Sequence, residues 1–461
     1  MAGFKSITRA LTTSAMTAVM LALTAASGHA QGLIRDTEIE EMLRDFADPL
    51  IVAAGLNTKS VDVYIVNDPT LNAFVTRGQK VFFHTGIITE FDSPNQLKGV
   101  MAHEVGHIAG GHLARSGDVG RSAYGTMLVA GALGLAAMLA GEGGAGAAIL
   151  GSSTQFATLD YLRYTRINES SADQAGAQYL ERTGQSGEGL IEFFEKFRYQ
   201  EVMSQQNRFP YFRSHPLSSD RIDSLREVVA ESPAFEAEDS AEDKHRLLIA
   251  QAKLNGFIDP PQTTFINYPE EDQSEAARLA RSVAHYRAAD LVNALRNIDS
   301  LLKEFPDNPY YHELKGQIYF ESGRAEKALP SLREALRLKP GAPLLEMALG
   351  QALIATNPVL TDERKARLEE GENLLKSTLR TEPENGFAWY LLSETYGKQK
   401  RDSYAKYAVA EQAYVAGNML RAQEFANRAM EGLSRDTAQY RRANDIATIA
   451  RATSRENRRR R

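Results

Sequence analysis

The C-terminal part of this chain repeats at a fixed spacing, and that spacing restricts the fold more than any other feature of the sequence. Pro306 and Pro340 stand 34 residues apart, and Pro383 follows after a further 43. The longer interval is one period plus a nine-residue insertion, which we place around Asn357–Ala366. Such a period predicts pairs of helices that stack on one another, because each pair can bury its apolar face only against its neighbours.

The small residues between the prolines indicate the type of repeat. Gly316, Tyr319, Ala328 and Ala335 stand where a tetratricopeptide unit needs small or aromatic residues for close helix packing. Neighbouring units fit more loosely, at Ala294, Gly350, Ser393, Tyr396, Ala410, Ala422 and Ala429. We expect about four units in an all-α domain over residues 275–450. The alternative is a helical bundle without repeats, which the proline spacing disfavours.

The stretch VMAHEVGHIAGGH, residues 100–112, holds three of the nine histidines of the chain. His103 to His107 reads H-E-x-x-H within a helix that we expect over residues 96–115. The two histidines then lie on one face and can bind one ion, while Glu104 stands beside them to accept a proton. The chain has no cysteine, so a metal site must use histidine and carboxylate ligands. The alternative is a pair of solvated histidines on an amphipathic helix.

A catalytic metal needs a third protein ligand, and the sequence offers candidates in two places. His112 follows His103 by nine residues, half a turn away from the ligand face, so we expect it to be solvated or to lie behind the ligands. Glu169 and Asp173, in NESSAD, are four residues apart on a helix expected over residues 161–182. One of them can reach the metal while the other accepts a hydrogen bond from a ligand histidine, and Glu169 is the better ligand candidate.

The rest of the N-terminal part reads as helices around a small sheet. Apolar periodicity predicts a helix at Glu38–Ala54 and strands at Val61–Val66 and Lys80–His84. Further helices are expected over residues 189–203, 218–230 and 244–254. The acidic, proline-rich residues 259–274 are the expected linker between an N-terminal domain, residues 31–258, and the repeats.

The first thirty residues have the layout of a secretory signal peptide. Lys5 and Arg9 precede an apolar run, and small residues end at Ala30. A membrane anchor is the alternative. Removal of this segment would take the formal net charge from −6 to −8, which argues against nucleic acid as the main partner. Residues 451–461 form a basic tail that ends in Arg458–Arg461, and this tail is either solvated or in contact with an anionic membrane surface.

A glycine- and alanine-rich insert covers residues 125–151. Its apolar run, Thr126–Ala140, is too short to span a bilayer. We expect a buried or mobile helical hairpin near the histidine cluster. A second membrane segment is the alternative.

These motifs together carry a family resemblance. H-E-x-G-H, then N-E-x-x-A-D, then Ser214-His215-Pro216 with Arg221, resembles the zinc metallopeptidases that include the CAAX prenyl proteases and the soluble HtpX-like enzymes. Exported members with tetratricopeptide repeats match nearly the whole mature chain. The resemblance implies an α+β, zincin-like metalloprotease domain, mostly helical with a small sheet, and one zinc ion per chain.

The resemblance also implies a role for each motif residue. The implied zinc ligands are His103, His107 and Glu169, the implied general base is Glu104, and Asp173 and Arg221 lie behind the ligands. His215 either polarises the substrate carbonyl or plugs the fourth metal position. Asn72, Ala73 and Phe74 belong to the region that offers a sheet edge to an extended substrate peptide. His84 is expected to be a strand residue and not a ligand.

The function that this resemblance implies is a periplasmic zinc endopeptidase with chaperone-like activity in outer-membrane protein assembly and quality control. Misassembled outer-membrane proteins would be its substrates, and the repeats would contact the assembly machinery. The alternative is a repeat-based chaperone or adaptor whose zinc site is normally closed. A membrane-embedded prenyl-protein protease is disfavoured, because no segment after residue 30 is long enough to span a bilayer.

Overall fold

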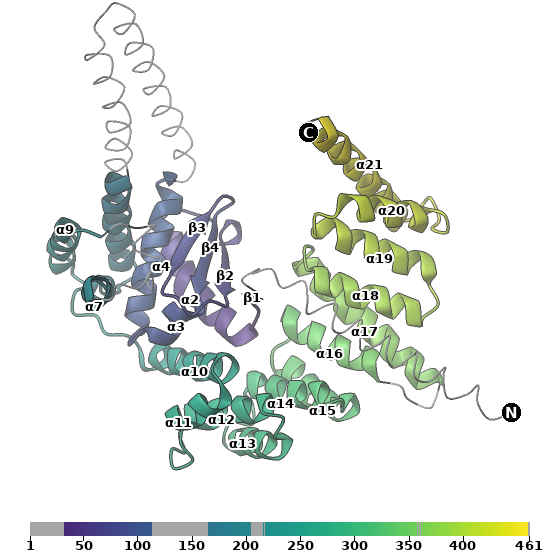
Figure 1. Ribbon diagram of the computed structural model, residues 1–461, viewed down its shortest axis with the longest axis horizontal. Helices are drawn as coiled ribbons and strands as arrows, with labels where there is room; N and C mark the ends of the chain where they lie inside the picture. The colour runs from purple at the N-terminus through teal and green to yellow at the C-terminus, as the bar shows by residue number, and fades with distance from the viewer. Residues whose placement is uncertain are drawn as a thin grey trace, which may run out of the picture.

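The computed structural model describes residues 32–112, 165–203, 215, 217–356, 358 and 361–459. Figure 1 shows an N-terminal part, residues 32–258, in which helices surround a small sheet. A repeat part, residues 275–459, forms an arc of stacked helices beside it. The prediction of a mostly helical chain with a small sheet is therefore confirmed.

The sheet of the N-terminal part has four strands in the order β1-β2-β4-β3. Their bounds are Leu33–Ile34 (β1), Asp62–Val66 (β2), Ala73–Thr76 (β3) and Lys80–His84 (β4). β2 and β4 are parallel, and β3 pairs antiparallel with β4 through a three-residue turn, residues 77–79, in which Gly78 and Gln79 have positive φ. Among the residues described, β3 is the outer strand of the sheet, with β4 on one side and no strand on the other. Its free edge is therefore open to a further strand.

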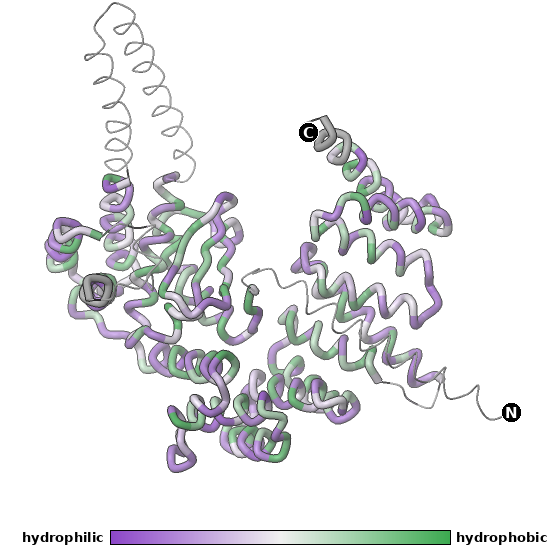
Figure 2. Tube along the Cα trace, viewed as in Figure 1, coloured by the Kyte–Doolittle hydropathy of each residue, from purple (hydrophilic) through white to green (hydrophobic). Residues whose placement is uncertain are grey.

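Among the described residues, six helices pack around this sheet. They are α2 (Thr37–Ala53), α3 (Thr85–Glu90), α4 (Pro94–Ala109), a helix over residues 165–182, α7 (Glu188–Met203) and α9 (Ser219–Ala230). Their apolar faces form one buried core with β2, β3 and β4. Figure 2 shows the hydrophobic residues gathered inside this part and polar residues on its outside. A short 3-10 turn, Thr58–Ser60, precedes β2.

Helix α4 carries the histidine cluster, and local chemistry sets both of its ends. The Ser93 hydroxyl accepts a hydrogen bond from the Gln96 amide, and Pro94 opens the first turn, where no amide proton is needed. The chain leaves the helix at Gly110 and Gly111, earlier than the expected residue 115. Thirteen of its residues are buried, so this helix runs through the core.

Helix α10 (Ala241–Ile258) joins the two parts of the molecule. Leu247, Ala250 and Leu254 belong to the N-terminal core, while Ile249 and Ala252 belong to the first core of the repeats. The helix is longer than the expected 244–254. We expected residues 259–274 to be a linker. They contain a short helix, α11 (Pro261–Asn267), because Pro261 can occupy the first position of a helix.

The repeat part contains five consecutive helix pairs among the residues described, where the sequence led us to expect about four. The pairs are α12 (Glu275–Arg287) with α13 (Leu291–Glu304), α14 (Pro309–Glu321) with α15 (Ala325–Leu338), α16 (Pro343–Ala355) with α17 (Thr361–Thr381), α18 (Gly386–Lys398) with α19 (Asp402–Val415), and α20 (Met419–Met430) with α21 (Ala438–Arg459). α21 runs through the expected boundary at residue 450, so the described part of the basic tail continues a helix.

The helix starts reproduce the sequence period. α12, α14 and α16 begin at residues 275, 309 and 343, which are 34 residues apart, and α18 begins 43 residues later. The insertion sits where we placed it: α17 has 21 residues, whereas α15 has 14. In Figure 1 the arc curves so that its middle helices face the start of the N-terminal part.

Two expectations from the sequence lie outside the described residues, namely the leader at 1–30 and the insert at 125–151. Within the described part of the chain, every helix is too short or too polar to cross a membrane.

Candidate metal centre

Helix α4 brings the two histidines of H-E-x-x-H onto one face. They are one turn apart, and their Nε2 atoms lie 3.0 Å from each other. Both rings are buried, and His103 has no exposed surface. Two imidazole nitrogens therefore point at one place inside the protein.

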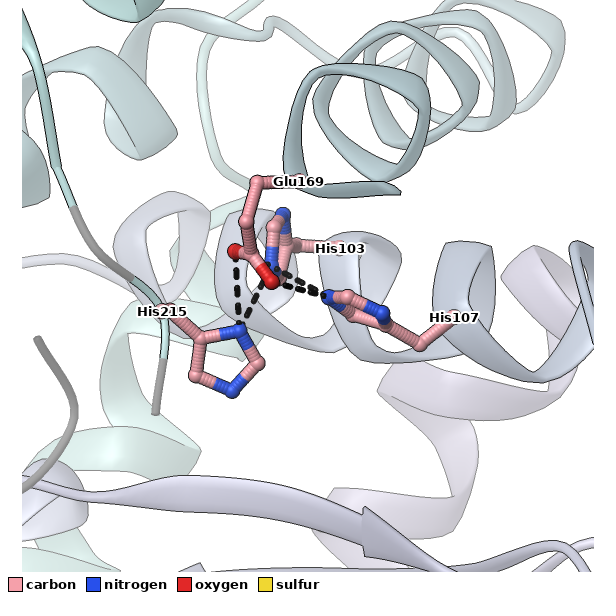
Figure 3. Close-up of side chains that lie close together, drawn as sticks. All are labelled: His103, His107, Glu169 and His215. Carbon is pink, nitrogen blue, oxygen red and sulfur yellow. Dashed lines mark hydrogen bonds and ion pairs between the residues drawn. The ribbon is translucent and has the colours of Figure 1, made fainter. Parts of the chain in front are cut away.

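The helix over residues 165–182 adds a carboxylate at the same place. Glu169 Oε2 lies 3.5 Å from His103 Nε2, and Glu169 Oε1 lies 3.4 Å from His107 Nε2. Figure 3 shows the Glu169 side chain directed between the two rings.

His215 completes the group from a third segment, just before α9. Its Nδ1 lies 3.0 Å from Glu169 Oε2 and 3.3 Å from His103 Nε2. The four donor atoms of His103, His107, Glu169 and His215 all lie within 4.8 Å of one another (Figure 3). Residues from three separate segments thus present four ligand-type atoms to one point.

Asp173 and Arg221 form a second layer behind these side chains. Asp173 Oδ1 lies 2.8 Å from His103 Nδ1, the nitrogen that faces away from the cluster. Arg221 donates two hydrogen bonds to the same carboxylate, at 2.7 and 2.8 Å. An imidazole whose Nδ1 carries the proton has its lone pair on Nε2, so this arrangement directs that lone pair into the cluster.

His112 is buried, and its Nδ1 lies 3.0 Å from His107 Nδ1, on the side away from the cluster. It is therefore not solvated, and it stands behind a ligand-type histidine. The expected half-turn offset does not apply, because α4 ends before His112 and the chain turns back at Gly110 and Gly111.

Glu104 is fully buried beside the cluster. Its two carboxylate oxygens accept no hydrogen bond from the described residues, and the nearest ion pair joins Oε1 to His215 Nε2 at 3.5 Å. Burial raises the pKa of this carboxyl group, and the charges of His215 and His103 only partly oppose the increase. A buried carboxylate without donors is unfavourable unless a cation or a reacting group faces it.

The donor set and its charge fit a divalent metal ion. With neutral histidines, Glu104, Glu169 and Asp173 supply three negative charges against the single positive charge of Arg221. Burial lowers the pKa of His103, but hydrogen bonds with Asp173 and Glu169 outweigh it and raise this pKa to about 10. The carboxylates thus attract a positive charge to the cluster, and histidine nitrogens with a carboxylate are usual ligands of such ions.

The expected substrate strand lies at the edge of the sheet. Ala73 and Phe74 belong to β3, and Asn72 precedes it with a buried Oδ1 that has no hydrogen-bond partner among the described residues. His84 lies at the end of β4, where its Nδ1 is 2.9 Å from the Thr70 hydroxyl, and it is not part of the ligand group.

Two glycines that the sequence motifs did not single out bring the helices of the site together. A Cβ atom on Gly106 would come within 2.8 Å of the Ala172 carbonyl oxygen, and one on Gly176 would come within 3.1 Å of the backbone of Ala102 and His103. Both lie in the motif helices, one inside H-E-V-G-H, and a search for glycines on the ligand faces would have found them.

Comparisons with known proteins relate the sequence of this chain to metalloproteases. Residues 34–229 match the model of peptidase family M48. The chain is 25% identical over 396 residues to the beta-barrel assembly-enhancing protease of Escherichia coli (strain K12), which covers 84% of this chain and 78% of that protein. It is 30% identical over 209 residues to the putative beta-barrel assembly-enhancing protease of Vibrio cholerae, covering 44% of this chain and 42% of that protein.

Metalloprotease YcaL of Escherichia coli is 28% identical over 169 residues, which are 36% of this chain and 61% of that protein. The chain is therefore a metalloprotease, and its residues 34–229 are similar to peptidase family M48. Over most of its length it is similar to the beta-barrel assembly-enhancing proteases. The family resemblance inferred from the sequence motifs is confirmed.

Proposed function

We propose that the chain is a zinc-dependent endopeptidase with one zinc ion per chain. The observation that carries this proposal is the convergence of four ligand-type atoms within 4.8 Å beside a fully buried glutamate. His103, His107 and Glu169 would hold the ion, which leaves one position for substrate, as catalytic zinc sites require. The bound ion would supply Lewis acidity, which polarises a carbonyl group and makes a water molecule more acidic.

Glu104 is the proposed general base. Its raised pKa makes it a stronger proton acceptor than a solvated glutamate, and its oxygens are not engaged by hydrogen bonds from the described residues. It would take the proton of the attacking water and pass it to the leaving amine. Asp173 would hold the tautomer of His103, and Arg221 would hold Asp173.

His215 is proposed to close the site in its resting state. Its Nδ1 stands among the ligand atoms, 3.0 Å from Glu169, where it occupies the position that a substrate carbonyl would need. Displacement of this ring would open that position. In the open state the ring could instead polarise the carbonyl, the other role that the sequence suggested.

The biological role is proposed from the relatives. The beta-barrel assembly-enhancing proteases are similar to 84% of this chain, so we propose that it acts on outer-membrane proteins in the periplasm. Residues 1–30 would direct its export, and the repeats, proposed to be tetratricopeptide units over residues 275–450, would hold partners of the assembly machinery. The proposed division into residues 31–258 and the repeats has its boundary near α10 and α11.

The test of the peptidase proposal is Glu104→Gln. This variant should bind as much zinc as the wild-type protein, because Glu104 is not a proposed ligand, and its cleavage rate should fall by about 10³-fold. Metal analysis of the purified protein and peptide cleavage measure the two properties. Glu181→Gln, an exposed position on the helix that carries Glu169, is the matched control. Wild-type cleavage by the Glu104 variant would overturn the assignment of the base.

A second candidate function is a repeat-based chaperone or adaptor. It is favoured by the five helix pairs of the repeat part and by the place of His215 within the ligand cluster. The two functions separate in a strain that lacks the gene. Full rescue of outer-membrane assembly by Glu104→Gln would assign the main role to binding, whereas no rescue would assign it to proteolysis.

A further inference from the structure

A pocket of about 450 Å³ opens between the β3–β4 turn and the C-terminal end of α4. Its lining residues are Thr76, Arg77, Gly78, Gln79, His107, Ile108 and Gly111. The volume is within the range of pockets that enclose a ligand group, so a long side chain can enter.

The pocket lies where an extended peptide would pass the candidate metal centre. Thr76 ends the edge strand β3, and His107 belongs both to the pocket wall and to the ligand cluster. A peptide that pairs with the free edge of β3 would direct alternate side chains to opposite faces. A side chain close to the bond being cleaved would therefore reach this pocket.

The mouth of the pocket is positively charged. Arg77 is exposed and has no ion pair with any residue that the structure describes. Lys80 adds a second cation near the turn, 5.6 Å from the centre of the Tyr64 ring. The nearby acid, Asp62, is in register with Lys80 on β2, on the opposite side of β4 from β3. Among the lining residues that the structure describes, none is a carboxylate.

The shape of the pocket suits a flexible stem with a charged end. Ile108 supplies an apolar wall, and a Cβ atom built on Gly111 would meet none of the described residues within 4 Å, so these residues leave space at the end of α4. The planar guanidinium of Arg77 can donate two parallel hydrogen bonds to a carboxylate.

We propose that Arg77 is a specificity-determining residue and that this pocket selects an acidic side chain, glutamate or aspartate, beside the scissile bond of the substrate. The inference rests on the proposed peptidase function. It adds the substrate class that the site prefers.

Cleavage of matched peptides tests the proposal. Short, C-terminally amidated peptides differ only in carrying Glu, Gln or Lys at one position on either side of the cleaved bond. At one position the wild-type protein should cleave the Glu peptide with a kcat/KM about tenfold above that of the Gln peptide. Arg77→Glu should reverse the preference towards Lys.

Lys59→Glu is the matched control. Lys59 is an exposed cation in the turn before β2, it does not line the pocket, and it undergoes the same change of charge. This variant should keep the wild-type preference. If Arg77→Glu also keeps the wild-type ratio of Glu to Lys cleavage at every position, the proposal is wrong.

Binding to the Glu104→Gln protein provides a readout without turnover. Fluorescence anisotropy of the same labelled peptides should rank Glu above Gln and Lys, and the added Arg77→Glu change should reverse the order. Peptides that carry a free C-terminus but no internal Glu distinguish a side-chain carboxylate from a terminal one. If the pocket binds a side-chain carboxylate, only an internal Glu should make binding depend on Arg77. Cleavage without any effect of Arg77 would refute this inference alone, whereas Arg77-dependent binding without cleavage by the wild type would refute only the peptidase proposal.

Discussion

His103 illustrates how a single residue is adjusted by its neighbours. One ring nitrogen faces the ligand cluster, and the other lies 2.8 Å from Asp173, which Arg221 in turn holds with two hydrogen bonds. The pKa of Asp173 is lowered because hydrogen bonds with His103 and Arg221 outweigh the effect of burial, which acts in the opposite direction. Asp173 therefore stays ionised and keeps accepting the Nδ1 proton of His103.

Asp173→Asn should weaken metal binding by 10- to 100-fold, because the amide cannot fix the tautomer of His103 as the carboxylate does. Competition with a chelator of known affinity measures this change. Asp223→Asn is the control, since Asp223 is an exposed residue of α9 whose ion pair with Arg226 lies at the surface. Equal zinc affinity in the Asp173 variant and the wild type would contradict the proposed role of Asp173.

Individual residues of the candidate site were easier to predict from the sequence than the packing of whole helices. The pairing of His103 with His107 follows from helix geometry alone, because residues four apart share a face. Glu169 became a ligand candidate because it shares a predicted helix face with Asp173, whereas His215 came only from the family resemblance, since nothing in the spacing of the chain relates it to α4. His112 was placed on an extended helix that ends before it, because the sequence did not show how Gly110 and Gly111 redirect the chain.

The crossing of α4 with the helix over residues 165–182 sets the distance between the histidines and Glu169. Gly106 faces the backbone of Ala172, and Gly176 faces the backbone of Ala102 and His103. Only glycine leaves room at such contacts, so the two backbones approach closely. This close approach brings the ligand-type atoms of His103, His107 and Glu169 together.

Gly106→Ala should separate the two helices and move Glu169 away from the histidines. A methyl group 2.8 Å from the Ala172 carbonyl oxygen forces the backbone to shift, and overpacking of this kind costs about 1–3 kcal/mol of stability. Urea unfolding and zinc content measure the two effects. We expect both to fall.

Gly397→Ala supplies the control at the element scale. Gly397 lies near the end of α18, and a Cβ atom there meets nothing within 4 Å. Its replacement should leave zinc content unchanged and raise stability by up to about 1 kcal/mol, because alanine favours the helix. If Gly106→Ala behaved like Gly397→Ala, close approach at Gly106 would not be required.

At the scale of the whole molecule, charged residues connect the N-terminal part to the repeats. The Arg35 guanidinium forms two ion pairs, from Nε to Glu40 Oε1 and from Nη2 to Glu382 Oε1, each at 2.6 Å. Lys339 Nζ lies 2.6 Å from Glu41 Oε2. Lys253 of α10 is buried and pairs with Asp36 at 2.7 Å and Glu38 at 3.2 Å. The N-terminal turn of α2 is therefore held by helices that are far away in the sequence (Figure 1).

Glu313 adds a further carboxyl group to this joint. Its Oε2 is buried and has no hydrogen-bond partner among the described residues. Burial raises its pKa to about 8, against the attraction of Lys253 and together with repulsion from Asp36, Glu38 and Glu40. The folded protein therefore binds a proton here between the unfolded pKa, near 4.5, and 8, so stability falls as the pH rises through this window.

Glu313→Gln should remove this pH dependence, because the amide carries no charge at any pH. Relative to the wild type, the variant should gain about 4 kcal/mol of unfolding free energy between pH 5 and pH 9, because the two pKa values differ over nearly three pH units of this range. Urea unfolding at several pH values measures the difference. Glu394→Gln, on the exposed surface of α18, should show no such gain. A constant difference between the Glu313 variant and the wild type from pH 5 to pH 9 would contradict the raised pKa.

Two features of this protein can be predicted from local periodicity in the sequence. The histidine pair follows from the helical repeat of 3.6 residues, and the stacked helix pairs follow from the 34-residue spacing of Pro306 and Pro340, because each pattern needs only the geometry of one element or one repeat. Three features needed the tertiary structure: how close α4 comes to the helix of Glu169, that His112 lies behind His107, and that Arg35, just before α2, pairs with Glu382. The first and the third join residues that are dozens to hundreds of positions apart, and all three depend on tertiary packing, which no local pattern specifies.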